Sequence, residues 1–313
     1  MQAPAIVRIF GTALRASWDD DVPRLGASVA YYTLFAIAPV LIVATAVAGM
    51  AFGEETARNQ IIDQLSLLIG YEGARTVQGL LEGAGQRRAG IIATALGGIT
   101  FIVAATGAFL ELQAVLNLIW RVKANPGANY RAFLIDRLRS FGLVVAIGFL
   151  LMVSLAMTAA LAAFGSWIAS GSTSRPLVWA IINVLVSMTV TTVLFGLLYR
   201  SLPDVQLRWR DVTTGAFVTA LLFTLGQQLI GLYLGQSSIA SSYGAAGSFM
   251  VLLLWVYYSC QIVLFGAEFT RVYAERCGVA PSPESFAKPD LAVIIAADSA
   301  QQERAEETPA AKP

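Results

Sequence analysis

The chain has 313 residues, of which 57% are hydrophobic and only 13% are charged. Soluble domains carry about a quarter of charged residues, so this composition argues against a soluble protein and indicates a membrane protein. The formal net charge is +1 and the chain contains no histidine. These two features argue against a nucleic-acid-binding surface and against a histidine-based catalytic or metal site. We therefore expect no enzyme activity, no metal ion, no cofactor and no nucleic acid partner.

The N-terminal segment, residues 1–24, has the pattern of a helix at a membrane surface. Apolar residues recur on one helical face, while Arg8 and Arg15 lie on other faces. This pattern predicts an amphipathic interfacial helix, although a helix packed on the bundle would show the same spacing. Asp21 stands before Pro23 and is expected to cap the next helix.

Six apolar runs are long enough to cross a bilayer. No Lys or Arg falls inside any of them. Pro39 lies within the first run and should kink its helix. Residues 55–88, between the first and second runs, predict two short amphipathic helices. The six runs cover residues 26–52, 90–119, 140–168, 177–199, 212–235 and 245–268.

The polar segments between the runs predict domain boundaries and orientation. We expect a six-helix transmembrane domain over residues 25–276 and a largely disordered cytoplasmic tail over residues 277–313, which is rich in Ala, Pro, Glu and Gln. With the N-terminus inside, 16 of the 21 Lys and Arg residues fall in inside segments. The positive-inside rule then places both termini in the cytoplasm. The expected fold is all-α: a polytopic membrane helical bundle with an N-terminal interfacial helix and short periplasmic amphipathic helices.

Three stretches carry a resemblance to a known family. They are ASVAYYTLFAIAPVLI at Ala27–Ile42, LYRSLPDVQLRWRDVTTGAFVTALLF at Leu198–Phe223 and YGAAGSFMVLLLWVYYSCQIVLFGAEFTRVYA at Tyr243–Ala274. In combination they resemble the YihY/BrkB family of bacterial inner-membrane proteins, formerly misannotated as ribonuclease BN. The resemblance covers about residues 5–276. It implies the same six-helix topology and a multi-pass location in the cell inner membrane. Because the family has no settled biochemical activity, the resemblance does not indicate which activity to expect.

The former nuclease name finds no support in the residues. A metal nuclease of the usual kind needs a cluster of histidines and carboxylates, and a ribonuclease needs a basic surface for phosphates. The tightest acidic groups are Asp19–Asp21 and Glu54–Glu55, and both are more simply explained as helix caps. Ribonuclease activity is therefore not expected.

Polar side chains within the apolar runs are costly in hydrocarbon, so each should face another helix or a water-filled cavity. Glu111 shares a face with small residues that allow another helix to approach, and we expect an amide such as Gln227 or Gln261 as its partner. Glu268 has Arg271 one turn beyond it and can form an interfacial ion pair. The alternative to a functional role is that same ion pair with Arg271 for Glu268, and a purely structural hydrogen bond between helices for Glu111 and the other candidates. The polar intramembrane candidates are Glu111, Asn117, Asn183, Gln227, Gln228, Gln261 and Glu268.

The basic residues that flank the runs on the expected cytoplasmic side have two explanations. They can act only by fixing the topology. They can also bind anionic lipid headgroups, which would gain about 1 kcal/mol per residue near an anionic leaflet. The headgroup-binding candidates are Arg121, Lys123, Arg131, Arg137, Arg139, Arg208 and Arg210.

Two classes of function fit these features. The first is a secondary transporter or a lipid-translocating protein, with membrane lipids as partners and an anionic or lipid-like substrate. It is preferred because acids inside a membrane are costly to keep without a use. The second is a non-transporting scaffold that maintains the envelope. No nucleotide-binding P-loop or Rossmann glycine pattern occurs in the sequence, so transport driven by ATP hydrolysis within this chain is not expected.

Overall fold

The computed structural model describes residues 3–53, 55–56, 58–63, 66, 74–75, 77–79, 82, 106–124, 176–236, 247–277, 282–283, 287–291 and 294. The expected third span at residues 140–168 lies outside the described residues, as do the headgroup candidates Arg131, Arg137 and Arg139. The predictions made for these segments therefore stay predictions.

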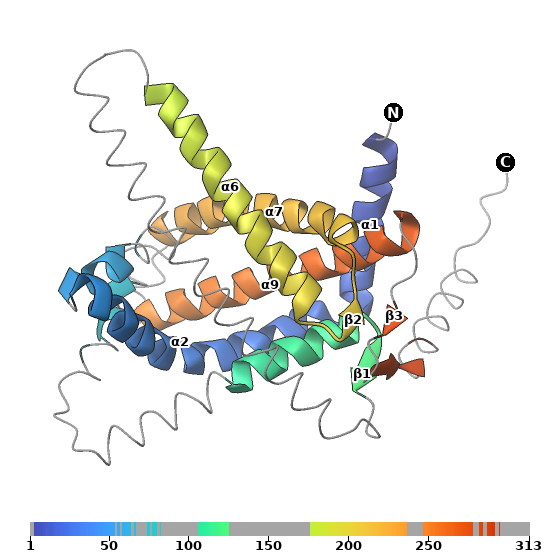
Figure 1. Cartoon of the computed structure of the whole chain (residues 1–313), viewed down its shortest axis with the longest axis horizontal. Coiled ribbons are helices and arrows are strands. Elements are labelled where there is room, and N and C mark those ends of the chain that lie inside the picture. Colours follow the sequence, from blue (N-terminus) through green and yellow to red (C-terminus); the bar gives the residue numbers. More distant parts are fainter. Residues whose placement is uncertain are drawn as a thin grey trace. The chain divides into compact units, whose positions relative to one another are not determined.

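The described part of the chain is helical apart from a few short strands (Figure 1). An unlabelled helix, Thr106–Ile119, is drawn in green. The labelled helices are α1 (Ala3–Asp19), α2 (Val22–Phe52), α6 (Pro176–Ser201), α7 (Trp209–Gln236) and α9 (Gly247–Cys277). The strands are β1 (Val122–Ala124), β2 (Val205–Gln206), β3 (Ser282–Pro283) and β4 (Ala287–Pro289).

Three of the described helices are long and apolar enough to cross a membrane. The segments that meet this condition are Val184–Ser201 in α6, Trp209–Ile230 in α7 and Phe249–Arg276 in α9. They coincide with the fourth, fifth and sixth predicted runs, and α2 coincides with the first. The all-α membrane helical fold is thus confirmed, while the total of six spans and the cytoplasmic location of both termini stay predictions.

The junction between α1 and α2 differs from the expected cap. Asp21 occupies the N-cap position of α2 in the left-handed region, with φ of 53°, and makes no side-chain capping bond. Its carboxylate instead lies 3.4 Å from Nε of Arg24 at the surface. The predicted capping by Asp21 is therefore wrong, because the reversed backbone turns its side chain away from the first free N–H groups of α2. α2 then runs continuously past Pro39 to Phe52, and the predicted kink stays a prediction.

Contacts divide the chain into two compact units. The first unit comprises Met1–Asp20, Ala114–Leu221 and Phe265–Pro313, and the second comprises Asp21–Gln113 and Leu222–Leu264. In the second unit, Ala30 of α2 and Val77 pack with Leu252 and Val256 of α9. This core holds the start of α2 against the first half of α9.

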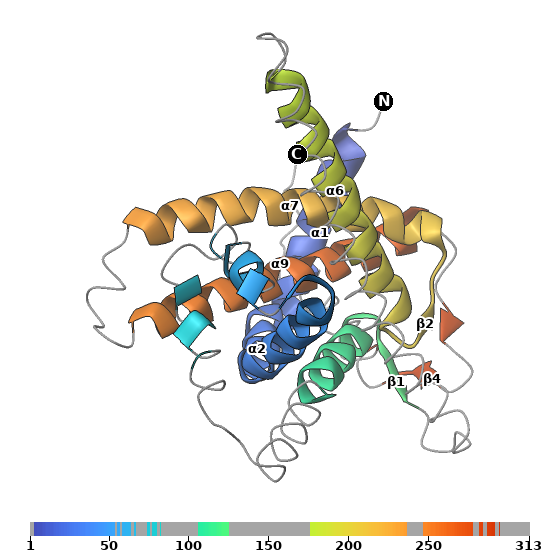
Figure 2. The same cartoon turned by 60° about the vertical axis from the view of Figure 1, so that its left-hand side comes forward.

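In the first unit, α1 packs on the C-terminal part of α9. Ile9 and Ala13, one helical turn apart, are buried against Phe269 and Val272. Figures 1 and 2 both show α1 passing beside this part of α9. Another face of α1 carries exposed apolar side chains, among them Trp18 at 74% exposure. The structure is therefore compatible with both predictions for this helix, because one face packs on α9 and another exposes apolar side chains that can contact a membrane surface.

The segment that follows α9 returns to two earlier loops of the first unit. β4 pairs antiparallel with β1, and β3 pairs antiparallel with β2; β1 and β4 lie side by side in Figure 2. Nζ of Lys123 lies 2.8 Å from Oδ1 of Asp290, and the Asp290 N–H donates to the Arg121 carbonyl at 2.9 Å. β3, β4 and Asp290 belong to the segment that was expected to be largely disordered, yet they are ordered by pairing with earlier loops. The composition of the segment could not reveal this order, because the partners lie far away in the sequence.

Candidate functional site

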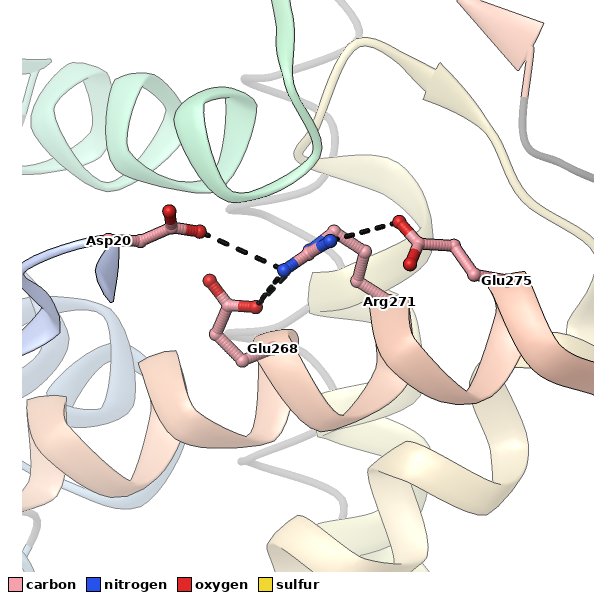
Figure 3. A network of polar contacts seen from close by, with 4 residues as sticks. All are labelled: Asp20, Glu268, Arg271 and Glu275. Atoms are coloured by element: carbon pink, nitrogen blue, oxygen red, sulfur yellow. Dashed lines mark hydrogen bonds and ion pairs between the residues drawn. The ribbon is translucent and has the colours of Figure 1, made fainter. Parts of the chain in front are cut away.

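A buried charged network joins the end of α1 to α9 in the first unit (Figure 3). Glu268 is fully buried and Arg271 is 5% exposed. Nη2 of Arg271 donates to Oε2 of Glu268 at 2.7 Å, and Nε donates to the same oxygen at 3.2 Å. Nη1 donates to Oε1 of Glu275 at 2.9 Å, and Nη2 also lies 3.8 Å from Oδ2 of Asp20. All three nitrogens of the guanidinium therefore face carboxylates.

Helical spacing and the packing of α1 together assemble this network. Glu268, Arg271 and Glu275 follow one another at i, i+3 and i+7, which places their side chains on one face of α9. Asp20 reaches them because the Asp20 N–H still donates to the Ala16 carbonyl, at 2.8 Å, and so continues the last turn of α1. The ion pair between Glu268 and Arg271, which the sequence predicted, is confirmed, and it is buried rather than superficial.

The network is not electrically or geometrically complete. Oε1 of Glu268 and Oδ2 of Asp20 are both buried, and neither finds a hydrogen-bond donor within the described residues. Glu275, by contrast, has a side chain that is 47% exposed and therefore solvated. A buried ion pair offsets the cost of desolvation only when the remaining lone pairs are satisfied. Oδ2 of Asp20 faces Arg271 at ion-pair distance, so the oxygen of this network left furthest from any donor is Oε1 of Glu268.

Close contacts between α6, α7 and α9 hold this part of α9 in place. The Tyr199 hydroxyl of α6 lies 3.2 Å from Oγ1 of Thr219 in α7. Gly266 of α9 lies directly beneath both groups, and Gly215 of α7 lies directly against Thr270 of α9, so that neither glycine leaves room for a Cβ. Small residues at such crossings allow membrane helices to approach closely. The glycines therefore fix the helix that carries Glu268.

The sequence prediction for Glu111 is partly corrected. Ser28 of α2 donates a hydrogen bond to the Glu111 carboxylate within the second unit. The expected amide partner Gln261 instead donates to the Pro23 carbonyl at 3.3 Å, with its amide in the space left by Gly26. Glu111 does face protein, but its partner is a hydroxyl because Gln261 is held at the first turn of α2.

Asn117 makes a pair of hydrogen bonds that the sequence did not reveal. Its Nδ2 donates to Oδ2 of Asp204 at 2.8 Å, and its Oδ1 accepts from the Asp204 N–H, also at 2.8 Å. The pair ties the helix Thr106–Ile119 to the turn after α6. Asp204 is buried and was not among the predicted site residues, and the signal in the sequence that could have found it is an acid directly after the end of an apolar run.

The remaining polar candidates are Gln227, Gln228 and Asn183. Gln227 is half-buried and Gln228 is exposed on α7, while Asn183 lies in α6 with a side chain outside the description.

The described headgroup candidates on the basic loops differ in their surroundings. Lys123 pairs with Asp290 and Arg208 lies 3.9 Å from Asp211, whereas Arg210 is exposed. Arg121 is half-buried, with a left-handed φ of 57°.

Comparisons with known proteins place the chain in a family. Residues 13–290 match the family described as virulence factor BrkB. The chain is 33% identical over 184 residues to the UPF0761 membrane protein YihY of Escherichia coli O1:K1, an alignment covering 58% of this chain and 60% of that protein. It is 29% identical to a UPF0761 membrane protein of Rhodospirillum centenum, with coverage of 87% of this chain and 59% of the relative.

A third relative, a UPF0761 membrane protein of Janthinobacterium sp., is 26% identical and is aligned over 91% of this chain and 65% of its own length. The chain thus spans about 60% of the length of the curated relatives it matches. No solved structure matches the chain. The relatives are named as membrane proteins, and the described helices are long and apolar enough to cross a bilayer, so the chain is an integral membrane protein. Because the match extends over most of its length, from the end of α1 to β4, the chain belongs to the virulence factor BrkB family.

Proposed function

We propose that the protein is a secondary transporter of the bacterial inner membrane and that it translocates an anionic, lipid-like substrate. The observation that carries this proposal is the charged network of Glu268 and Arg271, buried within a helix long enough to span a membrane. A charged side chain at the centre of a membrane helix costs about 2.5–3.5 kcal/mol on insertion scales. Membrane proteins that retain such groups mostly use them along paths for substrates, ions or protons.

The surface of α7 supports a lipid-like rather than a small polar substrate. Phe217, Leu221, Leu225 and Leu229 follow one another at four-residue spacing, and all four are at least 43% exposed. Residues at this spacing share one face of a helix. The acyl chains of a lipid can contact this apolar stripe while its charged headgroup moves along polar side chains.

A scaffold function is the alternative, and one observation favours it. Each nitrogen of the Arg271 guanidinium already faces a carboxylate, which is also what a static clamp between α1 and α9 would require. A scaffold needs the network only for stability, whereas a transporter needs the ionisable group itself.

Lipid translocation by the reconstituted full chain distinguishes the two functions. Vesicles carrying fluorescent NBD-phosphatidylglycerol in both leaflets are treated with dithionite, which bleaches only lipid that reaches the outer leaflet. We expect the wild-type protein to allow bleaching beyond the outer-leaflet fraction seen in protein-free vesicles. Glu268→Gln should slow this phase at least tenfold, whereas the matched variant Glu275→Gln, which changes a half-exposed acid of the same network, should not.

Bleaching that stops at the same level with and without wild-type protein would reject lipid translocation and favour the scaffold. Equal rates for wild type and Glu268→Gln would remove the buried acid from the mechanism. Size-exclusion chromatography of each variant before reconstitution separates loss of function from loss of folding.

A further inference from the structure

Three buried oxygen atoms of the first unit lack a hydrogen-bond donor within the described residues. They are Oγ of Ser17, Oδ2 of Asp20 and Oε1 of Glu268. Ser17 is 7% exposed and Glu268 is fully buried. A buried polar atom left unsatisfied costs about 1–3 kcal/mol, and more when it belongs to a charged group. A bound cation or proton, which accepts oxygen lone pairs, would offset this cost.

The packing of α1 on α9 brings Asp20 against Arg271, the ion-pair partner of Glu268, and buries the face of α1 that carries Ser17. Ser17 follows Ala13 by one turn on the buried face of α1, and Asp20 follows Ser17 by three residues. Nη2 of Arg271 lies 2.7 Å from Oε2 of Glu268 and 3.8 Å from Oδ2 of Asp20, so both carboxyl groups lie at the same guanidinium nitrogen. In Figure 3 the free oxygen of Glu268 points toward Asp20, away from the oxygen that binds Arg271. The guanidinium of Arg271 supplies one positive charge to the two carboxylates, and a further cation or a proton at Oε1 of Glu268 would relieve the repulsion that remains between them.

The charges of the buried groups indicate the valence of this ligand. Asp20 and Glu268 carry two negative charges and Arg271 carries one positive charge, which leaves a formal charge of −1. Glu275 is half-exposed and is compensated by solvent. One monovalent cation would neutralise the buried set.

We propose that Ser17, Asp20 and Glu268 form a buried binding site for one small monovalent cation, either a sodium ion or a proton. Hydroxyl and carboxylate oxygens are the ligands preferred by hard cations. The contact joins α1 to α9, so an occupied site stabilises this packing and an empty site weakens it. The inference deepens the proposed function, because a bound cation is what a secondary transporter exchanges for its substrate, and its physiological meaning rests on that function.

Thermal unfolding of the full chain in lipid nanodiscs tests the site without any transport assay. Unfolding midpoints are measured against increasing NaCl, with choline chloride added to hold the ionic strength constant, and then against pH in choline chloride alone. A ligand that binds only the folded state raises the midpoint in a saturable manner. We expect such a rise for sodium in the wild type, a shift of at least tenfold in the half-saturating concentration for Glu268→Gln and Ser17→Ala, and a wild-type response for Glu55→Gln, which changes an exposed acid outside the network.

Ser17→Ala removes one hydroxyl and no charge, so it serves as the decisive variant if Glu268→Gln does not fold. If the midpoint does not depend on sodium but depends on pH in the wild type and in Glu55→Gln, and not in Glu268→Gln, the cation is a proton. Midpoints independent of both sodium and pH in the wild type would overturn the proposal. So would an unchanged response in Ser17→Ala and Glu268→Gln, since a buried water or a mere ion pair predicts that result. Cation binding without lipid translocation would refute only the proposed function.

Discussion

Replacing Gly215 with alanine tests the close approach of α7 and α9 that holds the buried network. A Cβ at this position would lie 2.7 Å from Cβ and 3.0 Å from Cα of Thr270, and closer still to its hydroxyl. A rotation of the Thr270 side chain cannot relieve the contact with its Cα, so the two helices must separate. Overpacking costs about 1–3 kcal/mol, and a contact with backbone that no side-chain rotation relieves belongs in the upper part of that range, about 2–3 kcal/mol. Alanine recovers about 1 kcal/mol through its higher helix propensity, and the expected net loss is therefore about 1–2 kcal/mol.

This loss should appear as a lower midpoint of thermal unfolding of the purified full chain in detergent. For a chain of this size class, 1 kcal/mol shifts the midpoint by about 2–4 °C, so Gly215→Ala should unfold about 2–8 °C below the wild type. Gly11→Ala in α1 is the matched control, because nothing lies within 4 Å of its Cβ position. The control should be as stable as the wild type or up to about 1 kcal/mol more stable. A midpoint of Gly215→Ala at or above that of the wild type would refute the helix packing described here.

Three further outcomes are expected. A cysteine at Ser172 should react with an impermeant maleimide added to intact cells and a cysteine at Asn129 should not; the reverse pattern would overturn the predicted orientation. Asn117→Ala should lower the free energy of unfolding by about 1–3 kcal/mol, because the buried Asp204 loses both a donor to its carboxylate and an acceptor for its N–H; an unchanged unfolding curve would show that this pair is not needed for folding. Glu111→Gln keeps an acceptor for its serine donor and should unfold as the wild type does, whereas Glu111→Ala should lose about 1 kcal/mol, and equal midpoints for the two variants would contradict a structural role.

The positions of the spanning helices could be predicted because the bilayer sets the length of an apolar run. The run at residues 177–199 became α6, Pro176–Ser201. The sixth run was expected to end at residue 268, yet α9 continues to Cys277. A hydropathy pattern stops at the first charges, whereas a helix continues as long as one face is buried. Phe269 and Val272 supply that buried face by packing on α1.

The contacts within the candidate site were predictable only where both partners lie on one helix. Glu268 and Arg271 are three residues apart, and this spacing alone indicated their pair. Ser28 and Glu111 are separated by 83 residues, and no local pattern reports which helices meet. Asp20 was assigned to a helix cap for the same reason. Its signal in the sequence was an excess of acid, since three consecutive aspartates exceed what a single N-cap needs.

The pairing of β3 and β4 with two earlier loops has a consequence for the order of assembly. Translation delivers β1 and β2 to the membrane long before their partners, because β3 and β4 follow α9 in the chain. Until the ribosome has released these later residues, Val122–Ala124 and Val205–Gln206 lack the strands with which they pair in the folded chain. The two small sheets can therefore form only after α6, α7 and α9 have been synthesised. The time at which their amides become protected from hydrogen exchange would report when the first unit finishes folding.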